Sequence, residues 1–272
     1  MPRIEYHPTV RVRPECNWLI NHSRNVASQA GQDGILEKIF EIISVENQWC
    51  VEFGAWDGQH LSNTWNLINN KGWNGVLIEG SSTKFASLQA NHTENNVTLF
   101  NEYVGWEGEH SLDAILGRTP IPQSFDFLSI DIDGNDWYVW QALEKYRPRV
   151  VCIEFNPTIS HEVLFVQDRD PQINQGCSLL ALIELGKTKG YELVCAAPWD
   201  GIFVPAELFG KFNIPDNSIT SMWHAHPLET KLWQGYDGTF WAAGNLSVHW
   251  KQIPLDPSEF QVIPRSLRRY SN

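Results

Sequence analysis

The chain has 272 residues, of which 42% are hydrophobic and 19% are charged, and its formal net charge at pH 7 is −12. Such a chain can bury the core of one large domain with an extension, and its charge content is too low for intrinsic disorder. The acidic balance argues against nucleic acid or another polyanion as the main partner.

Strand and helix patterns alternate over the first three quarters of the chain. Residues 1–27 carry proline and polar residues without a clear period, so we expect an N-terminal arm. The segment from Ser28 to Asp33 opens the first helix, and one of these two residues is the expected cap. The expected strands cover residues 49–53, 75–79, 97–100, 125–130, 149–154, 191–197 and 201–204. The other expected helices lie around Leu61–Ile68 and at 82–91, 111–117, 137–145 and 178–189.

This alternation predicts one doubly wound α/β domain over residues 28–204. Five βα units come first, and the last two strands surround the turn Pro198-Trp199-Asp200, so we expect a parallel sheet that ends in a hairpin. Residues 205–272 are rich in tryptophan, histidine and proline and have no assignable fold. We expect this C-terminal extension to belong to the same domain.

The run CVEFGAWDGQH, residues 50–60, joins a strand end to two glycines. Gly54 and Gly58 allow a sharp turn and a close approach of the backbone to a ligand. A second strand ends at Glu79, whose carboxylate can accept hydrogen bonds from both hydroxyls of a ribose. The G-x-G-x-x-G pattern of dinucleotide dehydrogenases and the G-x-x-x-x-G-K-[ST] P-loop are both absent.

Oxygen donors follow the fourth and fifth strands. Asp131 and Asp133 come after one strand, and Glu154 and Asn156 come at the end of the next. Residues i and i+2 point to the same side of a strand, and strand ends meet at the ligand edge of such a sheet. Asp131, Glu154 and Asn156 therefore predict a site for Mg²⁺ or Mn²⁺. The alternative is that the aspartates cap a helix or shape the pocket without a metal.

A general base for an acceptor hydroxyl must lie within hydrogen-bond reach of it. His161 follows Asn156 on the loop that leaves the fifth strand, and Asp133 is an equally good candidate. The other histidines considered are His60, His110, His224 and His226.

Several motifs together resemble the FkbM-type group of class I S-adenosylmethionine-dependent methyltransferases. They are the segment from Ser28 to Asp33, VEFGAWDGQHLSN, GVLIEG, FDFLSIDIDGNDWYVW and VVCIEFNPTI. The resemblance implies a Rossmann-like seven-stranded sheet and S-adenosylmethionine as cofactor. It places Glu52, Gly54 and Asp57 around the methionine part, Glu79 at the ribose, Val104 near the adenine, and Asp131 in the same pocket. The acids also resemble those of metal-dependent O-methyltransferases of the caffeoyl-CoA and catechol kind.

The resemblance implies methylation of a hydroxyl on a small molecule, a sugar or another natural product, with Asp131, Asp133 and His161 as catalytic candidates. Nitrogen or carboxylate acceptors, and a cofactor-binding module without catalysis, stay open as alternatives. We expect no nucleic-acid or membrane partner, and a homo-oligomer is compatible with the sequence. We also expect the segment around residues 223–226 to wall the acceptor site, although packing elsewhere or a dimer contact is an alternative.

Composition also predicts the cellular compartment. Met1–Val10 lacks the apolar stretch of a signal peptide, and no apolar run has the length of a membrane span. Cys50, Cys152 and Cys195 lie in expected core strands, and no pair has C-x-x-C spacing. We therefore expect reduced cysteines in a cytoplasmic protein. Most of the 13 tryptophans are expected to fill the core, although those near the cleft could stack on a substrate.

Overall fold

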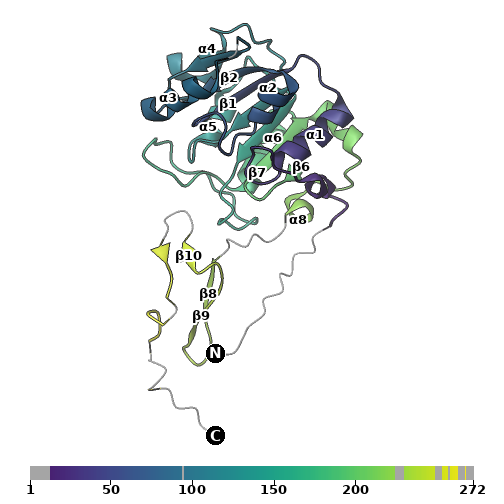
Figure 1. Cartoon of the computed structure of the whole chain (residues 1–272). Coiled ribbons are helices and arrows are strands. Elements are labelled where there is room, and N and C mark those ends of the chain that lie inside the picture. The colour runs from purple at the N-terminus through teal and green to yellow at the C-terminus, as the bar shows by residue number, and fades with distance from the viewer. Residues whose placement is uncertain are drawn as a thin grey trace.

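A seven-stranded sheet forms the centre of the computed structural model, which describes residues 13–93, 95–223, 230–248, 253–256, 258–262 and 267 (Figure 1). Its strand order is β3-β2-β1-β4-β5-β7-β6. The first five strands are parallel, and β7 runs antiparallel to both β5 and β6. The structure therefore confirms the predicted fold class, a class I methyltransferase sheet with a terminal hairpin.

The strand bounds agree with the sequence-based expectation to within two residues. The strands β4 and β5 begin slightly later than expected, because Asp126 and Arg149 form a buried ion pair of 2.7 Å just before them. The Asp126 carboxylate also accepts the N–H groups of Glu46, Asn47 and Gln48, which fixes the chain leading into β1. The strands are β1 Trp49–Phe53, β2 Asn74–Ile78, β3 Val97–Phe100, β4 Phe127–Ile130, β5 Val150–Glu154, β6 Tyr191–Ala196 and β7 Asp200–Pro205.

Helices connect the parallel strands, and the sheet grows in opposite directions from β1 and from β4. Right-handed crossovers in opposite directions place their helices on opposite faces of a sheet. The expected helix around Leu61 begins only at Trp65, because Leu61 has a φ of 58° and lies in the preceding loop. The helices of the sheet domain are α1 Gln32–Ile43, α2 Trp65–Lys71, α3 Ser82–Asn91, α4 Leu112–Leu116, α5 Asp136–Ala142 and α6 Leu179–Thr188.

The start of α1 differs from the expected cap. The N-cap residue is Gly31, at a φ of 92°, and no side chain caps it. The Asp33 carboxylate instead accepts the N–H groups of Val26, Ala27 and Ser28, so it holds the loop before the helix. The Ser28 hydroxyl accepts the Asp33 N–H, and thus satisfies a donor of the first turn without being the N-cap residue.

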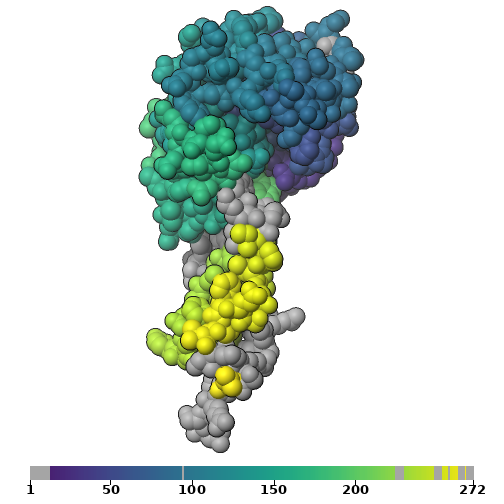
Figure 2. All heavy atoms as spheres, turned by 90° about the vertical axis from the view of Figure 1, so that its left-hand side faces the viewer, coloured from purple at the N-terminus to yellow at the C-terminus, as the bar shows by residue number. Residues whose placement is uncertain are grey.

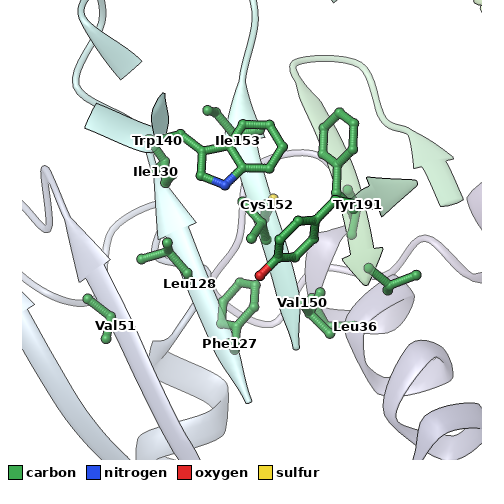
Figure 3. Packing of buried hydrophobic residues seen from close by; sticks show 14 of the residues in the cluster. Leu36, Val51, Phe127, Leu128, Ile130, Trp140, Val150, Cys152, Ile153 and Tyr191 are labelled. Carbon is green, nitrogen blue, oxygen red and sulfur yellow. The ribbon is translucent and has the colours of Figure 1, made fainter. Parts of the chain in front are cut away.

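Large apolar side chains fill the space between the sheet and its helices (Figure 3). Trp140 of α5 is fully buried, and its ring centroid lies 5.1 Å from that of Phe203 and 5.8 Å from that of Tyr191. Burying such aromatic side chains contributes about 1.5–3 kcal/mol each. Trp140 therefore anchors α5, the helix that follows Asp131 and Asp133, in the core.

The chain before α1 packs on the same domain. It contains the 3-10 helix η1 Trp18–His22. The buried Asn17 side chain donates to the Ala196 carbonyl and accepts the Ala196 N–H, and Trp18 donates to the Phe212 carbonyl. Residues 13–27 thus cover the β6 edge of the sheet.

Short helices follow the last strand of the sheet. Phe212, Ile214, Met222 and Trp223 are buried against the domain, so residues up to 223 complete its core. The remaining elements form two small sheets beyond it (Figures 1 and 2). The elements after β7 are α7 Ala206–Phe209, η3 Gly210–Phe212, α8 Ile219–Met222, β8 Thr230–Gln234, β9 Phe240–Gly244, β10 Ser247–Val248 and β11 Ile253–Pro254; η2 Gly108–His110 precedes α4.

The five cysteines are buried and free, and Cys50, Cys152 and Cys195 lie in β1, β5 and β6 as predicted. Among the described residues, no helix combines the length and the apolar character needed to cross a membrane.

Candidate functional site

A pocket of about 700 Å³ lies at the carboxyl ends of the central strands. Gly54, Glu79, Asp131 and Glu154 end or directly follow β1, β2, β4 and β5, and all four line it. Open α/β sheets bind ligands at this edge. The structure therefore brings together the motifs that sequence analysis had found at four separate places in the chain.

Gly54 is required by packing inside the protein. Its φ is 75°, and a β-carbon at this position would lie 1.9 Å from the Asp131 carbonyl oxygen. The sequence alone attributes the need for glycine to the approach of a ligand. The structure adds a stronger reason, because the backbones that leave β1 and β4 touch each other here.

Glu52 is buried at the base of the pocket, where residues 62–64 surround it; they follow the run CVEFGAWDGQH at residues 50–60, called motif I below. Its carboxylate accepts hydrogen bonds of 2.6 Å from the hydroxyls of Ser62 and Thr64 and one of 2.8 Å from the Asn63 N–H. Burial raises the pKa of Glu52, while these three bonds oppose the shift. Glu52 therefore lines the pocket mainly as the anchor of residues 62–64.

Glu79 is buried at the end of β2 and links the first two loops. One carboxylate oxygen accepts the Trp56 N–H at 2.9 Å, and the other accepts the Ser81 N–H at 2.7 Å. A carboxylate oxygen can accept two hydrogen bonds, so each oxygen keeps acceptor capacity. Glu79 can thus hold a diol while its own position is fixed by the backbone.

Trp56 forms a pocket wall that sequence analysis did not single out. It lines the pocket with its side chain 45% exposed, and the Lys84 ammonium lies 4.4 Å from the centre of its ring. His60 meets the same ring edge-on at 5.4 Å between centroids. The available signal was the position of Trp56 just after β1, because ligands bind at the carboxyl ends of the strands in such sheets.

The structure separates the remaining cofactor candidates. Val104 lines the pocket, in the chain that follows β3. Asp57 does not line it, and its carboxylate accepts the N–H groups of Gln59 and His60. Asp57 therefore shapes the turn after motif I.

Three acids converge at the other side of the pocket. Ligand oxygens of Asp131, Asp133 and Glu154 all lie within 4.8 Å of one another. The two aspartates are accessible to the pocket, and Glu154 is half-buried. Three hard oxygen donors at this spacing fit a divalent cation.

The electrostatics of this cluster favour a proton or a cation. Desolvation by the surrounding protein raises the pKa of Asp131 well above its usual value, although its carboxylate borders the pocket. Repulsion from Asp136 and Asp200 raises this pKa further. Burial and repulsion from Asp131 raise the pKa of Glu154 in the same way. The Asp131 and Glu154 carboxylates are close enough to interact directly, since their oxygens lie within 4.8 Å of each other. Like charges this close share a proton unless a cation neutralises them.

Two fully buried acids stand behind the cluster. Asp136 accepts the N–H groups of Ile132 and Gly134, and burial raises its pKa to about 6. Asp200 lies opposite Glu154 in the β5–β7 ladder and accepts a hydrogen bond from the Gln32 amide. Burial raises the pKa of Asp200 to about 6 as well. Gln32 belongs to the Ser28–Asp33 segment, so this segment contacts the acids behind the cluster through Asp200.

Asn156 does not join the acids. The strand β5 ends at Glu154, and the chain then turns away from strand geometry, so i and i+2 no longer share a side. The Asn156 side chain donates to the Gln175 carbonyl and accepts the Thr158 N–H and hydroxyl. Asp133 instead supplies the third carboxylate of the cluster. Its backbone has the left-handed conformation, with a φ of 58°.

His161 also lies outside the pocket lining. Its ring stacks on Trp223 with 5.6 Å between centroids and an angle of 20°. Trp223 is itself buried against Phe155, so it does not wall the pocket, and no other described residue after 204 lines it. His224 and His226 lie outside the described residues.

The loop between β5 and α6 forms the wall that we expected from the C-terminal extension. Pro171 and Asn174 of this loop line the pocket. The buried Gln167 organises the loop, because its amide donates to the Ile173 carbonyl and accepts the N–H groups of Gln175 and Gly176 at 2.8 Å. A long connection without helix or strand was the available signal, since such loops often bind ligands.

The loop is also attached to the neighbouring aromatic side chains of Tyr138 and Trp106. The Arg169 guanidinium lies 4.7 Å from the ring centre of Tyr138 and 5.7 Å from that of Trp106. Tyr138 belongs to α5 and donates to the Gln167 carbonyl, and Trp106 lines the pocket. Arg169 therefore ties the loop to one aromatic pair, Trp106 and Tyr138, whose ring centroids lie 5.9 Å apart, and Trp106 lines the pocket.

Comparisons with known proteins give similarity in shape only. No family model matches the sequence, and no curated protein matches it. A solved O-methyltransferase from Bacillus cereus in complex with SAH has a TM-score of 0.42, at 18% identity over 72% of this chain and 91% of that one. A putative O-methyltransferase from Klebsiella pneumoniae has a TM-score of 0.39, at 14% identity over 72% and 92%. The citrinin polyketide synthase CMeT domain has a TM-score of 0.43, at 11% identity over 64% of this chain and 51% of that one.

This chain thus spans about half of the CMeT-domain chain that it matches. The strand order of the sheet carries the fold assignment, and no matching family model supports the expected FkbM-type membership.

Proposed function

We propose that this protein is an S-adenosylmethionine-dependent methyltransferase that methylates a hydroxyl of a small molecule, in line with the FkbM-type motifs. The acceptor class that those motifs imply is a sugar or another natural product. The observation that carries the proposal is Glu79, buried at the end of β2 with both oxygens fixed and spare acceptor capacity in the pocket.

The residues of the pocket fit the cofactor. Gly54 leaves the backbone uncovered beside the base of the pocket, and Glu79 offers two oxygens to the ribose hydroxyls. Val104 offers an apolar surface to the adenine, and Glu52 and Asp131 border the space for the methionine part. When bound, S-adenosylmethionine supplies the methyl group on a sulfonium sulfur.

The protein's contribution is positioning and removal of a proton. The wall of Trp56, Trp106 and Trp199 and the 167–176 loop can exclude water and hold an acceptor oxygen in line with the methyl group. Asp133 faces the pocket and is our candidate to take the hydroxyl proton, with Asp131 as its neighbour. We do not assign this role to His161, whose ring is stacked on Trp223.

A divalent ion would be held by Asp131, Asp133 and Glu154. Such an ion would lower the pKa of a bound hydroxyl and orient it. The raised pKa of Asp131 and Glu154 supports this part of the proposal, because a cation relieves the repulsion that burial and close approach create. The buried, free cysteines fit the cytoplasmic location that we expect.

Calorimetry with S-adenosylhomocysteine tests the proposal before any acceptor is known. The full chain should bind this demethylated product of the cofactor with one site per chain, and NAD should not compete. A matched titration of the Glu79→Ala variant should show binding that is weaker by at least about tenfold. Absence of binding by the folded wild-type chain would contradict the proposal, whereas binding without transfer to any hydroxyl acceptor would favour a cofactor-binding module.

A further inference from the structure

The strands β8 and β9 form a hairpin that lies beyond the sheet domain (Figures 1 and 2). Trp233 pairs with Trp241, and Leu232 pairs with Ala242. An isolated two-stranded hairpin is marginally stable in water at best. A further surface or strand that packs on this hairpin would therefore stabilise it.

Apolar groups remain exposed on the hairpin. Leu232 is 53% exposed and Trp233 is 37% exposed. A small cavity of about 140 Å³ opens between the hairpin and Phe260, and all its lining side chains are apolar. Exposed apolar groups that are concentrated on one element mark an interaction surface.

One edge of the hairpin is already covered. The Gln261 side chain accepts the Phe240 N–H and donates to the Phe240 carbonyl, so it occupies the outer edge of β9. Within the described part of the chain, β8 pairs with β9 alone. The outer edge of β8 is therefore the edge that another strand can join.

The register shows which groups β8 presents there. Phe240 turns its N–H and carbonyl outward to Gln261, and its partner across the ladder is Gln234. In an antiparallel ladder, two directly opposite residues either both direct their N–H and carbonyl groups toward each other or both direct them outward. The two cases alternate along each strand, so every second residue is directed outward. Gln234 and Leu232 consequently direct their N–H and carbonyl groups to the outer edge of β8.

Charge favours contact between two copies at this end of the molecule. Residues 230–272 contain five basic residues (lysine or arginine) and three acidic ones. Residues 1–229 contain 15 basic and 29 acidic residues. The acidic parts of two copies repel each other, so a contact that keeps them apart is favoured.

We propose that the protein forms a dimer through β8, with the β8 strands of two copies paired antiparallel around a twofold axis at Leu232. The result is a four-stranded sheet in which each Leu232 exchanges two backbone hydrogen bonds with the other copy. Lys231 then lies opposite Trp233 of the second copy, and Thr230 lies opposite Gln234, so no like charges face each other. This contact does not depend on the methyltransferase activity.

Sedimentation of the full chain over a range of concentrations tests the dimer. Wild-type protein should sediment at twice the chain mass of 31.2 kDa. Leu232→Pro removes the outward N–H and leaves the β8–β9 ladder intact, so it should sediment as the monomer. Leu232→Val keeps the N–H and the strand preference, so it should remain dimeric. S-adenosylhomocysteine affinity of all three proteins provides a readout of the distant pocket.

Crosslinking supplies a second test that does not depend on the proline variant. The five native cysteines are buried, so the cysteine introduced at position 232 by Leu232→Cys is the thiol that reacts. A short bismaleimide should link two Leu232→Cys chains, and it should leave wild-type and Tyr236→Cys chains unlinked, since residue 236 lies past the paired strand. A monomeric wild type, a Leu232→Pro dimer, or no link at residue 232 would each overturn the proposal.

Discussion

Gly54 and Asp131 touch through their backbones, so closely that a β-carbon on residue 54 would lie 1.9 Å from the Asp131 carbonyl oxygen. This contact joins the end of β1, where the cofactor motif lies, to the end of β4, where the acid cluster begins. The two halves of the pocket are therefore positioned by one backbone contact, and a change on either side should affect both.

Gly54→Ala should destabilise the protein beyond the cost of its positive φ. Gly72 provides the matched control, because its φ of 69° is similar to the 75° of Gly54 but no atom lies within 4 Å of an added β-carbon. Gly72→Ala should cost about 1 kcal/mol of unfolding free energy. Gly54→Ala should cost about 1–3 kcal/mol more, since the ends of β1 and β4 must separate. Urea denaturation of the two variants measures the difference, and equal costs would contradict the contact.

Glu79→Ala should weaken S-adenosylhomocysteine binding by at least about tenfold. Hydrogen bonds to a charged group contribute about 1.5–3 kcal/mol each, and about 1.4 kcal/mol corresponds to tenfold in affinity. The substitution also frees the Trp56 and Ser81 N–H groups, so thermal unfolding must accompany the calorimetry. Glu144→Ala, an exposed site outside the pocket, is the control and should change neither quantity. A smaller loss in folded Glu79→Ala would exclude a ribose contact.

The acid cluster should bind Mn²⁺, and Asp133 should matter more than Asn156. Asp133→Asn removes a charge from the three converging acids and should weaken Mn²⁺ binding by about tenfold or more. Asn156→Ala should leave Mn²⁺ affinity nearly unchanged, because that side chain is bonded to Gln175 and Thr158. Electron paramagnetic resonance of free Mn²⁺ measures both affinities. Equal weakening would return Asn156 to the ligand set.

Asp200 should make the protein less stable at neutral pH than at mildly acidic pH. Its pKa rises from 3.8 to about 6 on folding, so the folded state binds the proton more tightly than the unfolded state. Stability from this group is complete below pH 4 and is lost as the pH rises through about 6, by up to about 3 kcal/mol. Asp200→Asn keeps an acceptor for Gln32 but cannot ionise.

The stability of Asp200→Asn relative to wild type should therefore increase between pH 4 and pH 7. Urea denaturation in EDTA at several pH values measures this difference without competing metal ions. A difference that is constant with pH would mean that Asp200 keeps its usual pKa.

Strands were predictable to within two residues because they are short, mostly apolar runs bounded by polar residues, and all but β3 are almost wholly buried. The residues directly after those strands, Gly54, Glu79 and Asp131, were predictable for the same reason, since strand ends meet at one edge. Asn156 was not, because its placement depends on where β5 stops and on the hydrogen bonds of the following loop. His161 and the pocket-lining loop residues likewise depend on contacts between distant segments, which no local pattern encodes.

Gln167→Ala should loosen the loop that walls the pocket. The Gln167 side-chain oxygen accepts the N–H groups of Gln175 and Gly176, and each such bond contributes about 0.5–1.5 kcal/mol. Hydrogen exchange of these two amides should therefore accelerate roughly 3–10-fold in the variant. Gln172→Ala, an exposed substitution in the same loop, should leave their exchange unchanged. Because Gln167 is buried outside the pocket lining, S-adenosylhomocysteine affinity should stay close to wild type while acceptor turnover falls. Unchanged exchange at Gln175 and Gly176 would mean that Arg169 and the Tyr138 hydrogen bond suffice to hold the wall.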